Sequence, residues 1–212
     1  MPAANKQTVW GTSPGFDQIS YFWAMLTPSI SDPVGAALLN SFRQNFQQYK
    51  TLADRALAQL TTDAEWLYQP APGSNSVVVI VQHLVGNLRS RFTDFLTTDG
   101  EKPTRQRDAE FEEPVSVAAV PALKQDWEAA WRILFDLLDE LQPADLLRTV
   151  VIRGEPHTVL AAVQRQVAHY ASHVGQLVQL AKIIQGDAFQ SLSIPRGQSG
   201  QFNQQMASRV AK

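Results

Sequence analysis

The sequence predicts an all-α fold, an up-down-up-down four-helix bundle with long connections and a small hairpin before the fourth helix. Four segments carry apolar residues at alternating steps of three and four, the spacing of helices that bury one side in a bundle. Capping residues and turn formers stand at the ends of these segments. The 212 residues are 44% apolar, enough to bury one core.

The first two helices differ in how clearly the sequence marks them. Asp32 and Pro33 can cap and start the first, and Ser74 or Asn75 can cap the second. The second opens with VVVIV at 77–81, whose β-branched residues also suit a strand, but its apolar stripe continues at helical spacing. The first stripe is Leu39, Phe42, Phe46, Tyr49, Ala53, Ala56 and Leu60. The second is Val77, Val81, Leu84, Leu88, Phe92 and Phe95.

The last two helices have the clearest periodicity, and Gly186 is a plausible C-terminal stop for the fourth. The third stripe is Val120, Leu123, Trp127, Ala130, Leu134, Leu137 and Leu141. The fourth is Leu160, Val163, Val167, Tyr170, Val174, Leu177, Ala181 and Ile184.

Two connections are longer than an up-down-up-down bundle needs. Residues 97–116 are rich in charge and turn formers, and residues 142–159 contain a predicted hairpin around Gly154. Long ordered loops often carry function, although a solvated linker is an equally good interpretation.

The bundle domain is expected over residues 33–186. Residues 1–32 form an extension too aromatic for a disordered arm, which we expect to dock. Residues 187–212 begin with the apolar anchors Phe189, Leu192 and Ile194, expected to pack back on the bundle before a polar, frayed end.

Composition excludes several classes of function. A net charge of -2 and a pI near 6.1 argue against nucleic-acid binding. No apolar run approaches the about 20 residues of a membrane span, and no secretory signal pattern begins the chain, so we expect a cytoplasmic protein. Because the chain has no cysteine, it offers no thiolate ligand or cysteine nucleophile, and any reacting thiol must come from a substrate.

Histidines supply the main candidate for a site. His169 and His173 lie one turn apart on the flank of the fourth apolar stripe, beside Gln166, and His83 lies on a polar border of the second helix. Three imidazoles from two helices can converge on one metal ion at about 2.0 to 2.1 Å. The alternative is that His169 and His173 are ordinary half-exposed helix residues that bind no metal. His157 suits a role in a hairpin or cap better than a role in a site. The residues that share the border with His83 are Ser76, Asn87 and Asp94.

Other familiar catalytic patterns do not occur. The histidine pair lacks the glutamate of HExxH, neither member belongs to a Glu-x-x-His motif, and there is no GxSxG, P-loop or GxGxxG. Zinc-protease, carboxylate di-iron, serine-hydrolase and nucleotide-binding chemistry therefore have no support from motifs.

A histidine midway along the second helix followed by His-x-x-x-His on the fourth resembles the DinB-like (YfiT-type) superfamily of metal-dependent enzymes, over roughly residues 35–200. Longer strings resemble one bacterial branch of unknown function within it. These strings are NSVVVIVQHLVGN, RFTDFLTTDGEKPTRQRDAEF, RGEPHTVLAAVQRQVAHYASHVGQL and SLSIPRGQSGQFN. The resemblance implies a divalent ion, nickel, zinc or iron, held by His83, His169 and His173, and a homodimer packed through bundle helices.

Characterised relatives in the superfamily include transferases and isomerases that use low-molecular-weight thiols, and some hydrolases. The resemblance therefore favours a thiol-dependent S-transferase acting on a small molecule. A hydrolase, in which the metal lowers the pKa of bound water toward about 7, is one alternative, and a non-catalytic dimeric scaffold or binding protein is another. Residues expected to orient ligands or bind substrate are Asn87, Gln166, Arg153, His157 and Arg196.

Overall fold

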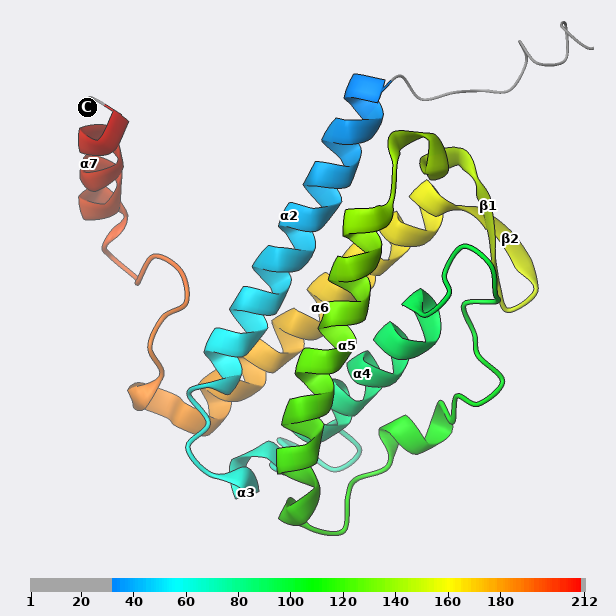
Figure 1. Cartoon of the computed structure of the whole chain (residues 1–212). Helices are drawn as coiled ribbons and strands as arrows, with labels where there is room; N and C mark the ends of the chain where they lie inside the picture. The colour runs from blue at the N-terminus through cyan, green and yellow to red at the C-terminus, as the bar shows by residue number, and fades with distance from the viewer. Residues whose placement is uncertain (1–31, 211–212) are drawn as a thin grey trace, which may run out of the picture.

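A computed structural model describes residues 32–210, in which four long helices lie side by side (Figure 1). The long helices are α2 (Asp32–Leu57), α4 (Val77–Phe92), α5 (Val120–Glu140) and α6 (Val159–Gln185). The shorter helices are α3 (Asp63–Trp66), η1 (Asp108–Phe111), η2 (Val117–Ala119), η3 (Pro143–Leu147), η4 (Gly186–Ala188) and α7 (Ser199–Val210). The mostly helical fold is confirmed, and the proposed aromatic extension lies outside the described residues.

The four predicted helices begin and end close to the predicted positions. The cap of α4 is Ser76, whose hydroxyl accepts a hydrogen bond from the Val79 amide, one or two residues after the predicted cap. This helix ends at Phe92 rather than continuing to Phe95. Gly186 ends α6 with a φ of 52°, a conformation that favours glycine.

The directions of the helices differ from the predicted up-down-up-down order. Phe46 of α2 packs on Tyr170 of α6, and Glu65 just after α2 accepts a hydrogen bond from Gln185 at the end of α6, so these two helices run the same way. The start of α5 pairs with α3, just before α4, through Lys124 and Asp63. The segments that follow α4 and α5 also meet, because Gly100 donates a hydrogen bond to Val151 of the strand after α5, and both helices begin at the same end of the bundle (Figure 1). Helices α4 and α5 are therefore parallel to each other and antiparallel to α2 and α6.

The long connection between Phe92 and Val120 makes this order possible. Helix α4 has 16 residues, about 24 Å at 1.5 Å per residue. Residues 93–119 return over that length to the end where α4 began, and η1 packs against α4 on the way (Figure 1). We call residues 93–119 the crossover; it covers α4 beside His83.

The predicted hairpin is confirmed. Strands β1 (Thr149–Ile152) and β2 (Glu155–Thr158) pair antiparallel, with Ile152 opposite Glu155. Arg153 and Gly154 form the two-residue turn, both with positive φ, as in the type I′ turns that suit the twist of a hairpin. The Asp99 carboxylate accepts hydrogen bonds at 2.8 Å from the backbone amides of both turn residues, which attaches the hairpin to the crossover.

Asp99→Asn is expected to destabilise the protein at pH 7 and to have a smaller effect in acid. Backbone hydrogen bonds from Glu101, Gly154 and Arg153 hold the pKa of Asp99 below its usual value. The ionised carboxylate therefore adds stability above the unfolded-state pKa, about 3.9, and that contribution is lost as pH falls through the lower folded-state pKa. Urea midpoints at pH 7 and pH 3 measure this, with the exposed Asp136→Asn as control. Equal midpoints for both variants at pH 7 would contradict the assigned role.

The segment after α6 packs on the bundle as far as Leu192 and then leaves it. Phe189 and Leu192 are partly buried against the core, whereas Ile194 is 40% exposed. Residues 199–210 form α7, a helix that the sequence did not lead us to expect and that stands apart from the bundle (Figure 1). None of the helices within residues 32–210 combines the length and apolarity needed to cross a bilayer.

Candidate metal centre

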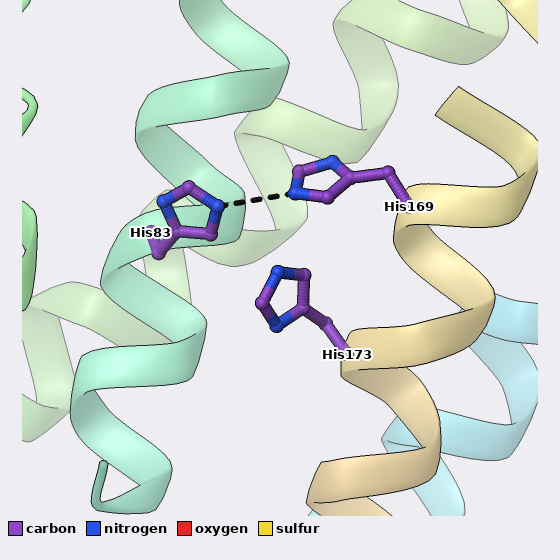
Figure 2. A group of neighbouring side chains, drawn as sticks. All are labelled: His83, His169 and His173. Carbon is purple, nitrogen blue, oxygen red and sulfur yellow. Dashed lines mark hydrogen bonds between the residues drawn. The ribbon is translucent and has the colours of Figure 1, made fainter. Parts of the chain in front are cut away.

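Three histidines from two antiparallel helices meet at one place, as predicted (Figure 2). His83 comes from the middle of α4, and His169 and His173 come from successive turns of α6. One ring nitrogen from each lies within 4.8 Å of the other two, and the Nε2 atoms of His83 and His169 are 3.2 Å apart. His83 is 5% exposed, and the other two are partly buried. The cluster has the size and donor set of a metal site.

Each imidazole is held by a hydrogen bond at Nδ1. For His83 the acceptor is Glu110 Oε2 at 3.0 Å, for His169 it is Gln166 Oε1 at 3.1 Å, and for His173 it is Gln176 at 3.0 Å. An ionised carboxylate only accepts, so the Nδ1 of His83 carries the proton. These acceptors fix the Nδ1–H tautomer and leave the Nε2 lone pairs free, as in histidines that ligate metals.

The protonation state of the two histidines on α6 also suits metal binding. Burial, followed by the neighbouring His173 and His83, lowers the pKa of His169 to about 3. Burial also lowers the pKa of His173, although its hydrogen bond to Gln176 raises it. A lowered pKa keeps an imidazole neutral at pH 7, the form that binds a metal ion.

The crossover supplies a second layer of charge around His83. Arg105 donates two hydrogen bonds of 2.7 Å to the carboxylate of Glu110 and one of 3.1 Å to Glu101. Burial raises the pKa of Glu110, but the hydrogen bonds from Arg105 and His83 lower it more, so the carboxylate stays ionised. Arg105 thereby keeps in place the anion that orients His83.

Gly86 makes the approach of Glu110 possible. It lies one turn after His83 on α4, and a Cβ built on it would lie 2.6 Å from Glu110 Cδ and even closer to Oε1. Real Cβ atoms do not come so near a neighbour, so only glycine allows this contact. Gly86 is needed here because it has no side chain, and its conformational freedom plays no part.

A cavity of about 310 Å³ opens beside the three histidines. Among the residues that the sequence pointed to, Asn87, Gln166 and Arg153 line it. Asn87 Oδ1 accepts a 2.9 Å hydrogen bond from the buried Tyr170 hydroxyl, which leaves its amide NH₂ as a donor for the cavity. His157 on β2 and the exposed Arg196 do not line the cavity. The full lining is His83, Asn87, Arg91, Arg105, Arg107, Phe111, Arg153, Arg165, Gln166, His169 and His173.

Sequence reasoning missed the residues that the crossover brings to the site. Glu110 stands in a loop with several other carboxylates, and nothing in its spacing singles it out. Two arginines outside the crossover did offer a signal, and Arg165 is the first, because it precedes His169 by one turn of the same helix. Arg91 follows His83 by eight residues, about two turns, which places it on the same side of α4.

No curated protein and no solved structure matches the chain at a significant level. The placement within the DinB-like superfamily stays a prediction. A family model does match residues 33–198. This range contains the whole histidine cluster and all four long helices, except the first residue of α2. On that match over more than half of its length, the chain belongs to the family described as "Protein of unknown function (DUF1572)".

Proposed function

We propose that the protein is a divalent-metal-dependent enzyme whose ion is held by His83, His169 and His173. The observation that carries this proposal is the 3.2 Å separation of two Nε2 atoms whose rings already donate through Nδ1. Two lone pairs that face each other in a buried place repel, and a cation between them turns the repulsion into two bonds. Three imidazoles suit zinc, nickel or iron better than magnesium or calcium, which prefer oxygen ligands.

The residues around the cluster favour a reaction that needs no base from the protein. No carboxylate lines the cavity among the described residues, and the chain has no cysteine. A divalent ion held by neutral ligands would lower the pKa of a thiol or water bound beside it. Asn87 can donate a hydrogen bond to the bound substrate, while Gln166 and Glu110 keep two of the ligand rings oriented.

A thiol-dependent S-transfer fits these features best. In this reaction the substrate thiol loses its proton to solvent, and its sulfur forms a bond to an electrophilic carbon of a second substrate. The leaving group departs with the electron pair of the bond that breaks. Positive charge from the arginines that line the cavity stabilises the thiolate over the thiol. Hydrolysis of an ester or amide is the alternative, since water can take the place of the thiol.

Thermal unfolding with matched pairs of thiols and alcohols tests the proposal. Cysteine is compared with serine, and mercaptoethanol with ethylene glycol, in zinc-loaded and metal-free protein. A thiol at a hundred times its Kd should stabilise the loaded form by about 2.7 kcal/mol, roughly 5 to 10 °C in Tm, with no effect of the alcohol. No thiol effect together with turnover of an ester panel supports the hydrolase. No response to either panel contradicts an enzymatic role.

A further inference from the structure

The wall of the histidine cavity carries an unusual concentration of arginines. Five of them line it, together with the three histidines, and no acidic residue does so among residues 32–210. They come from α4, the crossover, the hairpin turn and α6, which are separate in the sequence. These arginines are Arg91, Arg105, Arg107, Arg153 and Arg165.

Two of the five already have partners that account for them. Arg105 has all three nitrogens bound by Glu110 and Glu101. Arg153 lies in the hairpin turn, with its Nε 3.4 Å from Glu101. Both hold the crossover and hairpin in place, so their role is structural.

Arg91 is buried without such a partner. It is 3% exposed, its Nε and Nη1 have no hydrogen-bond partner within residues 32–210, and its Nη2 lies 3.8 Å from Glu101, beyond hydrogen-bond distance. A Cβ at Gly100 would lie 2.9 Å from Nη1, so the chain leaves room for this guanidinium. Burying a charged group without hydrogen bonds destabilises the fold, and an anion in the cavity that Arg91 lines would balance its charge.

The remaining two arginines lie at the solvent-exposed rim. Arg165 has no ion pair within the part of the chain that the structure describes, and it precedes His169 by one helical turn. Arg107 stacks its guanidinium on Phe111 at 5.1 Å, and its one carboxylate neighbour, Asp108, is fully exposed at 3.9 Å. Within residues 32–210, Arg91 and Arg107 therefore have only distant carboxylate neighbours, at 3.8 and 3.9 Å, and Arg165 has none, around one small cavity.

We propose that Arg91, Arg107 and Arg165 bind the carboxylate or phosphate group of a small organic anion whose other end faces the three histidines. Guanidinium groups pair with both kinds of oxyanion through two parallel hydrogen bonds. A volume of about 310 Å³ holds about ten water molecules at about 30 Å³ each, so the enclosed part of this anion is small. The inference rests on the proposed function, because the anion would be the substrate of the metal site.

Calorimetric titration of the metal-free protein at low ionic strength tests the arginines directly, with inorganic phosphate and succinate as two probes. Binding of phosphate alone identifies a phosphate site, and binding of succinate alone identifies a carboxylate site. Arg165→Gln and Arg107→Gln should each weaken the binding by about tenfold or more. Arg132→Gln, which removes an exposed arginine from α5 outside the cavity, should change Kd less than twofold. No binding of either probe, or equal weakening by all three variants, overturns the proposal.

Arg91→Met separates a binding role from a structural one. An apolar side chain of similar length in place of a buried, unpartnered charge should leave Tm unchanged or raised, while anion binding weakens by about tenfold or more. A lower Tm with unchanged anion binding would show that Arg91 is structural and would overturn its assignment.

Zinc titration of the same preparations keeps the two proposals apart. If zinc binds and neither anion does, the anion site is wrong and the metal site stands. If an anion binds in an arginine-dependent way and zinc does not bind, the metal-dependent function is wrong and the anion site stands.

Discussion

Replacing His169 with alanine is expected to abolish binding of the metal ion. The parent protein, purified without a histidine tag, should hold about one divalent ion per chain, and His169→Ala close to none. The side chain supplies one of only three nitrogen donors, 3.2 Å from the His83 donor. Changes in residues that merely support metal ligands already lower affinity by about 10 to 100-fold, so removal of a ligand should lower it by more. Elemental analysis and zinc titration measure the change.

His157→Ala is the matched control for this experiment. His157 lies on β2, outside the cavity, so the same loss of an imidazole there should leave the metal content unchanged. Circular dichroism should show that both variants keep the helical fold. Equal metal content in the parent and His169→Ala would rule out the three-histidine centre.

Replacing Gly86 with alanine is expected to damage the site without touching a histidine. The new methyl group would occupy the position of the Glu110 carboxylate, which Arg105 and His83 hold from two sides. Glu110 must then move, and His83 loses the acceptor that orients its ring. We expect zinc affinity to fall by about 10 to 100-fold, the range typical for loss of such a partner. Alanine in place of glycine normally stabilises a helix, but here the displacement of Glu110 should offset most of that gain.

Gly175→Ala supplies the control. Gly175 is exposed on α6, with no atom within 4 Å of a Cβ built there, so alanine should stabilise the protein by about 1 kcal/mol. Zinc affinity should not change in this variant. If Gly86→Ala behaved like Gly175→Ala in both measurements, the contact between Gly86 and Glu110 would not matter for the site.

Much of the secondary structure could be predicted because it follows from local periodicity. Helix α4 shows this most clearly: VVVIV favours a strand by composition, yet all five residues are buried in a helix. Burial of this turn of the helix on all sides outweighed the intrinsic preference of β-branched residues. The same periodicity placed His83 on the side of α4 that meets His169 and His173.

The direction of the helices could not be derived in the same way. An apolar stripe looks the same whether its helix runs up or down. Periodicity therefore does not tell which helices of the bundle are parallel and which are antiparallel. The length of the connection at 97–116 was the available signal, since long connections permit parallel neighbours. We predicted an up-down-up-down order in spite of that length, and the parallel packing of α4 and α5 shows that it is wrong.

The sequence by itself determined the four long helices, the hairpin and the places of the three histidines on their helices, because each depends on residues a few positions apart along one element. Tertiary structure alone decided the surroundings of these histidines. Glu110 reaches His83 because the crossover returns over α4 and Gly86 leaves it room, and Arg91 and Arg165 line one cavity because α4 and α6 are antiparallel neighbours. Such contacts join residues far apart in the chain, and no local pattern encodes which distant partner a loop side chain will find.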